Sequence, residues 1–141
     1  MGARIAEHPD IDAVSFTGSV PTGRQIGVTC ASLGKKVQME MGGKNPMVVM
    51  DDADLDVAIG ACVNGAFFST GQRCTASSRL IVTKGIYDKF VDALTEAADN
   101  LVVGDALDSA TQIGPVVDEK QLQQNVDYVK LAADEGCDVR G

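Results

Sequence analysis

Short apolar runs alternate along the chain with longer stretches in which apolar residues recur at helical spacing. Runs with the character of β-strands occupy residues 13–16, 36–41, 46–50 and 79–83. Stretches with helical periodicity lie at residues 23–33, 54–68, 86–101 and 118–135. Because strands and helices alternate, the pattern predicts an α/β protein in which the strands pair largely in parallel.

Turn-forming and capping residues mark the ends of several predicted helices. Pro21 suits a first helical turn, where its missing N–H leaves no bond unmade, and Asp118 suits an N-cap. Gly34 and Gly136 are expected to stop the helices that precede them. In the helix predicted at 54–68, the residues expected to face the core are Leu55, Ile59, Cys62, Val63 and Ala66. In the last predicted helix they are Leu122, Val126, Val129 and Ala133.

The two ends of the sequence give an incomplete pattern. It opens on a single strand–turn–helix unit, and residues 137–141 (CDVRG) resemble the start of a new strand. We therefore expect the sequence to be an internal segment of a longer protein. Its isolated strands would expose edges that a larger sheet covers, so we expect the segment alone to fold poorly and to be inactive.

Composition and charge exclude several classes of function. Across 141 residues the net charge is −8, which argues against a nucleic-acid surface because such surfaces are basic. No apolar run approaches the roughly 20 residues of a membrane-spanning helix, and the first residues lack the apolar core of a signal peptide. Unpaired cysteines in an acidic α/β chain suggest a reducing compartment, so the cytoplasm is the expected location.

The sequence gives little support for a metal site. The 4 cysteines form no CxxC pair, and the single histidine, His8, cannot complete a zinc site. The acidic run that begins at Asp52 fails as a calcium loop, because Val57 and Val63 stand where the loop needs Gly and Glu. Asp52 or Asp54 is better interpreted as a helix N-cap.

The hexapeptide GSVPTG, residues 18–23, offers a candidate anion site. A strand end, a glycine turn and a helix start would bring free N–H groups and the positive helix terminus to one point, as phosphate binding requires. The glycines would let a ligand approach the backbone. An ordinary strand-to-helix turn explains the same residues, and the hexapeptide alone favours that alternative.

Glu40 is an unusual residue for its place in a predicted strand. Met39 and Met41 flank it, and burial among apolar neighbours would bring a carboxylate toward the useful range of a general base. The two glycines that follow leave room for a ligand. The pattern alone fits equally well a glutamate at the end of a strand that faces solvent.

Cys74 is the candidate nucleophile. It follows a glycine turn and precedes a strand, and Arg73 beside it would favour the thiolate. The alternative is a small buried cysteine, the commoner fate of this residue. Cys62 fits that alternative because it lies on the apolar side of its helix, and neither Cys30 nor Cys137 offers chemistry.

Three stretches together resemble the aldehyde dehydrogenase superfamily: HPDIDAVSFTGSVPTG, VQMEMGGKNPMVVMDDADLD and FFSTGQRCTASSRLIV. Their order and the spacing of Glu40 from Cys74 match, and the likeness covers essentially the whole chain. The resemblance implies that Cys74 is the nucleophile and Glu40 the general base. It further implies that Gly18, Ser19 and Gly23 belong to the cofactor pyrophosphate region and that the Met41 backbone lies near the nicotinamide.

The resemblance also implies a domain organisation and partners. Residues 1–41 would form the end of a Rossmann-like NAD(P)-binding domain, and residues 42–141 the start of the catalytic α/β domain. The cofactor would be NAD or NADP, the substrate a small aldehyde, and the parent protein a homo-dimer or homo-tetramer. Family members are longer, and the oxyanion asparagine, the ribose-binding lysine and acidic residues and the oligomerisation hairpin lie outside these residues.

The implied reaction oxidises an aldehyde to a carboxylic acid through a thiohemiacetal and a thioester on Cys74. The alternatives are a truncated, inactive segment, and a family member that passes the acyl group to phosphate or coenzyme A. Glu40 argues against the latter, because such a transfer needs no water-activating base. Likeness to the 2-oxoglutarate semialdehyde subgroup suggests a carboxylate-bearing substrate near Phe68 and Arg73. The alternative is that Arg73 points away from the substrate, and the alternation of adjacent side chains in an extended segment favours it.

Overall fold

The structure is a computed structural model that describes residues 2–140. The chain divides into two compact units, Met1–Gly43 and Lys44–Gly141, and each is described by itself. The division falls close to the domain boundary predicted after residue 41. That the first unit belongs to a cofactor domain and the second to a catalytic domain stays a prediction.

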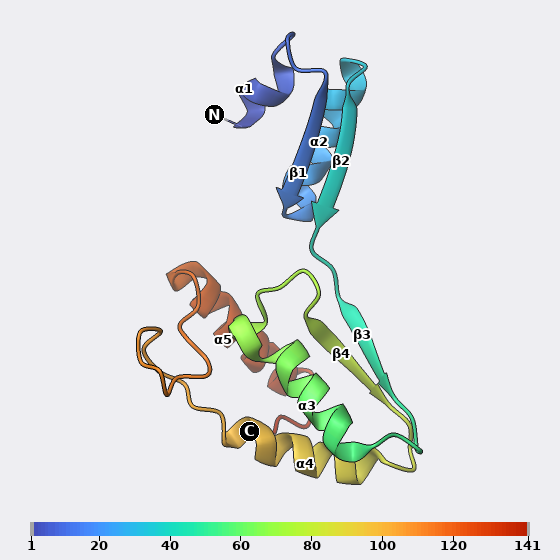
Figure 1. The fold of residues 1–141 in the computed structure, drawn as a ribbon, viewed down its shortest axis with the longest axis vertical. Helices are drawn as coiled ribbons and strands as arrows, with labels where there is room; N and C mark the ends of the chain where they lie inside the picture. Colours follow the sequence, from blue (N-terminus) through green and yellow to red (C-terminus); the bar gives the residue numbers. More distant parts are fainter. Residues whose placement is uncertain (1, 141) are drawn as a thin grey trace. The chain divides into compact units, whose positions relative to one another are not determined.

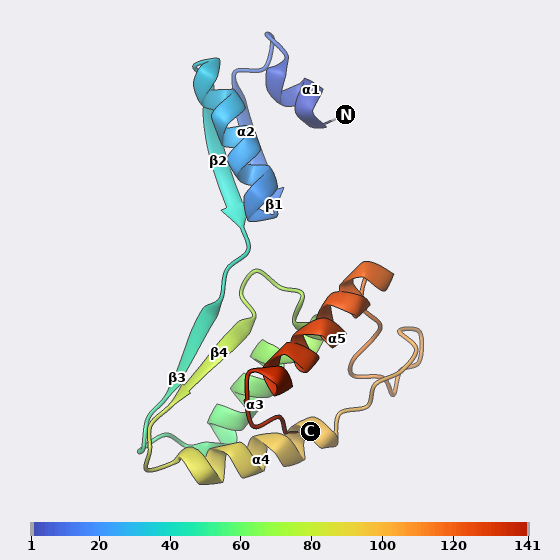
Figure 2. The same ribbon diagram turned by 180° about the vertical axis from the view of Figure 1, so that it is seen from behind.

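The first unit is a parallel strand–helix–strand unit preceded by a short helix. Its elements are α1 (Gly2–Glu7), β1 (Ala13–Gly18), α2 (Val20–Ser32) and β2 (Lys36–Met41). The strands pair in parallel from Ala13 opposite Lys36 to Gly18 opposite Met41, and α2 covers one face of the pair (Figures 1 and 2). Cys30, near the end of α2, is fully buried. The predicted strand 36–41 is therefore confirmed, and parallel pairing with it.

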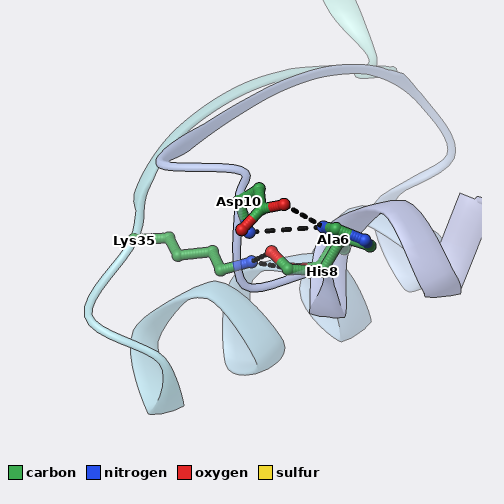
Figure 3. Close-up of polar contacts among 4 residues, drawn as sticks. All are labelled: Ala6, His8, Asp10 and Lys35. Carbon is green, nitrogen blue, oxygen red and sulfur yellow. Dashed lines mark hydrogen bonds and ion pairs between the residues drawn. The ribbon is translucent and has the colours of Figure 1, made fainter.

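Lys35 ties the short helix α1 to the rest of the first unit. Its Nζ donates to the backbone carbonyls of Ala6, at 2.8 Å, and of His8, at 2.6 Å (Figure 3). A cation at a helix C-terminus satisfies carbonyls that have no partner within the helix. The sequence pattern missed α1, because six residues are too few to show a helical period.

The second unit places two helices on one face of another parallel strand pair (Figures 1 and 2). Its elements are β3 (Asn45–Val49), α3 (Leu55–Ala66), the 3₁₀ helix η1 (Phe68–Gly71), β4 (Ser77–Val82), α4 (Tyr87–Asp99) and α5 (Glu119–Asp134). The buried core between the strands and the helices consists of Val49, Ala58, Cys62, Ile86 and Phe90. β3 and β4 pair in parallel, as the pattern predicts.

Most predicted helix boundaries are confirmed. Asp54 caps α3 through Val57 N–H at 3.1 Å, and Asp118 caps α5 through Gln121 N–H at 2.8 Å. Gly34 and Gly136 follow their helices with positive φ angles of 67° and 78°. α2 begins at Val20, earlier than the predicted residue 23, because Ser19 caps it and Pro21 lies in its first turn.

Two expectations about the second unit are wrong. The apolar face of α5 is exposed: Leu122, Val126 and Val129 are 45%, 54% and 59% accessible, and Ala133 is exposed too. Among the described residues no element covers that face. Residues 137–140 form no strand, and Gly141 lies outside the described residues.

The face of α3 differs in detail from its prediction. Cys62 is fully buried as expected, whereas Leu55, Ile59, Val63 and Ala66 are half-buried. Ala58, which the sequence pattern passed over, is buried because its small side chain lets α3 approach the sheet. The helix ends at Ala66, before the predicted Phe68.

Candidate functional site

Cys74 occupies a tight turn between η1 and β4. The Ala76 N–H donates to the Arg73 carbonyl at 3.0 Å, so Cys74 and Thr75 are the central residues of the turn. Cys74 is exposed. Within the part of the chain that the structure describes, its backbone N–H has no hydrogen-bond partner. An exposed thiol beside a free backbone donor suits attack on a carbonyl whose oxygen becomes negative.

The Cys74 carbonyl, in contrast, is held from a distant part of the sequence. The side-chain amide of Asn45, the first residue of β3, donates to the Cys74 carbonyl at 2.7 Å and to the Ala76 carbonyl at 3.2 Å. Sequence reasoning missed Asn45. Its signal is its place in the GGKNP segment, where an amide precedes a proline at the start of a strand.

The backbone just before Cys74 has a left-handed conformation. Ser69, Thr70 and Gly71 have φ angles of 55°, 52° and 68°. Residues with a side chain adopt this region at a cost of about 1–2 kcal/mol each. A Cβ at Gly71 would lie 3.1 Å from the Ala66 carbonyl oxygen as well. The turn is closed by the Gln72 N–H, which donates to the Ser69 carbonyl at 2.9 Å. Strained backbone of this kind concentrates at functional sites.

Arg73 points toward the end of α3. Its guanidinium donates to the backbone carbonyl of Asn64 and, at 3.4 Å, to the Asn64 side-chain oxygen. Asn64 lies in the last turn of α3, where carbonyls lack helical partners. These contacts favour the interpretation in which Arg73 faces away from a substrate. The substrate contacts suggested for Arg73 and for the half-buried Phe68 stay predictions.

Glu40 is exposed on β2. Side chains alternate along a strand, so Met39 and Met41, which are half-buried, face α2 while Glu40 faces the opposite side. The structure thus gives the solvent-facing alternative rather than an apolar enclosure. Because Glu40 and Cys74 belong to different units, the structure describes each half of the proposed site by itself.

The start of α2 has the donors of an anion site. The Ser19 Oγ caps the helix through Thr22 N–H at 3.4 Å and lies 3.0 Å from the Thr22 hydroxyl. The first turn carries no acidic residue, which fits a phosphate-bearing group because a carboxylate there would repel it.

The two glycines of this motif lie against strand side chains. A Cβ at Gly23 would lie 2.5 Å from the Met41 sulfur, and one at Gly18 would lie 2.6 Å from the Phe16 ring. Gly23 therefore lets α2 approach the Met41 side chain closely, and Gly18 leaves room for the Phe16 ring of its own strand, β1. Their contact with a cofactor stays a prediction.

The remaining cysteines differ in accessibility. Cys30 and Cys62 are buried and Cys137 is exposed. Burial raises the pKa of the Cys62 thiol, so Cys62 forms less thiolate than an exposed cysteine. Among residues 2–140 there is no group of three or more His, Cys, Asp or Glu placed to hold a metal ion, and none of the helices there combines the length and apolar character needed to cross a membrane.

A family model described as "Aldehyde dehydrogenase family" matches residues 1–140. The chain belongs to the aldehyde dehydrogenase family. It is 44% identical over 97% of its length to the alpha-ketoglutaric semialdehyde dehydrogenase of Bacillus subtilis (strain 168), covering 28% of that protein. It is 46% identical over 96% of its length to the betaine aldehyde dehydrogenase of Rhizobium leguminosarum bv. trifolii (strain WSM2304), again covering 28% of the relative.

Solved structures of aldehyde dehydrogenases have the same fold. Betaine aldehyde dehydrogenase from Staphylococcus aureus in complex with NAD+ matches with a TM-score of 0.93 and 36% identity, over 96% of this chain and 27% of that one. The NAD+ complex of aldehyde dehydrogenase from Bacillus cereus matches with a TM-score of 0.92 and 40% identity, over 96% of this chain and 28% of that one. The α/β fold expected from the resemblance is confirmed.

Proposed function

We propose that the chain is the part of an NAD(P)-dependent aldehyde dehydrogenase that carries its nucleophile, Cys74, and its general base, Glu40. The observation that carries the proposal is the Cys74 turn, with its exposed thiol and a backbone N–H that has no partner among the described residues. The chain spans 28% of the length of these curated relatives. The activity therefore belongs to the longer protein that contains it.

In the proposed reaction the Cys74 thiolate attacks the aldehyde carbon and forms a thiohemiacetal. The Cys74 N–H donates to the oxygen that becomes negative, which stabilises the transition state. A bound nicotinamide supplies the acceptor for the hydride that leaves the same carbon. The product on Cys74 is a thioester, in which the former aldehyde carbon is at the oxidation level of a carboxylic acid.

Glu40 acts in the second half of the proposed reaction. Its carboxylate takes a proton from water, and the resulting hydroxide attacks the thioester carbon. The carboxylic acid leaves and the Cys74 thiolate is restored. The presence of a water-activating carboxylate favours hydrolysis over transfer to phosphate or coenzyme A.

The start of α2 is the proposed cofactor contact. Ser19, with the donors of the first turn, would hold the pyrophosphate, and the positive end of a 13-residue helix adds to the attraction. Gly18, Gly23 and the Met41 backbone complete the proposed region. The NAD+ complexes of the Staphylococcus aureus and Bacillus cereus proteins support NAD, and NADP is the alternative. A cytoplasmic homo-oligomer remains the expected form of the parent protein.

An assay with two aldehydes of equal chain length, one ending in a carboxylate, tests both activity and substrate class. The longer protein should form NADH or NADPH with at least one of them, and we expect the carboxylate-bearing aldehyde to be preferred. The name of the Bacillus subtilis relative supports that choice. The name of the Rhizobium relative favours a cationic aldehyde instead. Absence of activity in the longer protein with these two aldehydes and with a cationic one would contradict the proposed activity.

Substitution of Arg73 by leucine separates a substrate role from a structural one. A lost charged hydrogen bond to the substrate should lower kcat/KM for the carboxylate-bearing aldehyde alone. The fall should correspond to a loss of about 1.5–3 kcal/mol of transition-state stabilisation. Because Arg73 already contacts Asn64, we expect instead an equal fall for both aldehydes and a lower melting temperature. A selective loss would contradict this expectation and return Arg73 to the substrate site.

A further inference from the structure

We infer that Asn45 is a positioning residue that fixes the orientation of Cys74 for attack. The inference rests on the proposed function, because it concerns how the nucleophile is held. Asn45 is half-buried. Its side-chain amide donates hydrogen bonds to the carbonyls of Cys74 and Ala76, which lie 29 and 31 residues further along the chain. Both partners are oxygens, so only the amide NH2 can face them.

The local backbone explains why a side chain performs this task. The residue after Asn45 is Pro46, which has no N–H to donate to the neighbouring strand. The register also shifts here, since Asn45 pairs with Ser77 and Pro46 with Arg79. Irregularities of this kind re-aim side chains and are common beside active sites. The Asn45 amide replaces the missing backbone donor and extends the attachment past Ser77, the first residue of β4, back to Cys74.

The two bonds act on the dihedral angles that set the thiol. The Cys74 carbonyl, held at 2.7 Å, fixes ψ of Cys74, one of only two soft backbone angles at that residue. The Ala76 carbonyl, held at 3.2 Å, anchors the far side of the turn. Arg79 Nε adds a third bond between the same segments, to the Lys44 carbonyl at 3.1 Å. Together these contacts hold the exposed turn in one conformation, as a preorganised nucleophile and its oxyanion donor require.

Asn45→Asp in the longer protein tests the inference. Aspartate keeps the shape of asparagine, but its ionised carboxylate can only accept and would face two carbonyl oxygens. In single turnovers with enzyme in excess, the rate constant of NAD(P)H formation should fall roughly 10–100-fold. The fraction of enzyme with a titratable Cys74 should stay near that of the wild type. The difference in this rate constant between Asn45→Asp and the wild type should become smaller at lower pH, because the protonated aspartic acid can again donate a hydrogen bond.

Asn100→Asp is the matched control. Asn100 also donates its side-chain amide to a backbone carbonyl, that of Glu96 at 2.9 Å, but at the end of α4. This control should leave the single-turnover rate constant unchanged. If Asn45→Asp does not fold, Asn45→Ala gives the same comparison without the repulsion.

Three outcomes would decide between the proposals. A wild-type rate constant in the Asn45 variants, with Cys74→Ala inactive, overturns the positioning role alone. A loss confined to the titratable fraction and the melting temperature, with the rate per titratable site unchanged, also overturns it. Activity that persists in Cys74→Ala overturns the proposed function instead.

Discussion

Replacing Cys74 with alanine should lower the turnover of the longer protein by at least roughly 10⁴-fold, because no bond to the aldehyde carbon can form without the thiol. Cys74 is exposed in its turn, so the substitution leaves no cavity and should barely change the melting temperature. Turnover is measured from NAD(P)H formation, with stability followed in parallel. Activity above a tenth of the wild-type value would contradict the assignment of the nucleophile.

Cys137→Ala is the matched control, because Cys137 is the other exposed cysteine among the described residues. It should keep wild-type turnover. Limiting iodoacetamide gives a second measurement, in which the adduct should map to Cys74. Cys30 and Cys62 are shielded by burial, so the informative competitor is Cys137. Faster labelling of Cys137 would contradict the proposed reactivity of Cys74.

The regular parts of the fold could be predicted because their determinants are local. The alternation of residues 36–41 gave a strand with the observed bounds. Asp118, and Asp54 as one of two candidates with Asp52, were recognisable as caps because a carboxylate accepts the N–H of a residue three positions later. Parallel pairing followed from the order of strands and helices. Each of these signals lies within a few residues of the structure that it specifies.

What the sequence missed depends on contacts between distant segments. The contact of Asn45 with Cys74 joins β3 to a turn that follows α3, and a linear pattern cannot show it. The left-handed angles of Ser69 and Thr70 break ordinary preferences for residues with a side chain. The apolar face of α5 was predicted to be inward from periodicity, but periodicity does not say whether a covering element is present in this chain.

The glycine motif shows how one pattern can have two physical causes. Gly18 and Gly23 were predicted as places where a cofactor approaches the backbone. In the structure, strand side chains fill the space that a Cβ would need at each position. Packing is therefore a second reason for glycine at both positions. The proposed cofactor contact rests instead on Ser19 and on the uncompensated positive end of α2.

Glu40→Gln should separate the two halves of the proposed reaction. Glutamine has nearly the shape of glutamate but cannot take a proton from water, so thioester hydrolysis should slow roughly 10²–10⁴-fold. Attack by Cys74 and hydride loss do not need the base. We therefore expect a pre-steady-state burst of NAD(P)H that approaches one equivalent per active site, followed by a very slow steady state.

Glu7→Gln provides the control in the same unit, because Glu7 is an exposed glutamate at the end of α1. It should leave both the burst and the steady-state rate unchanged. Because Glu40 is also exposed, its substitution should change the melting temperature little, so a slow steady state would reflect chemistry rather than unfolding. If instead the burst disappears while iodoacetamide still labels Cys74 at the wild-type rate, Glu40 acts before the thioester forms, in attack or in hydride loss. The role of Glu40 as the base for hydrolysis would then be contradicted, while that of Cys74 as nucleophile would stand.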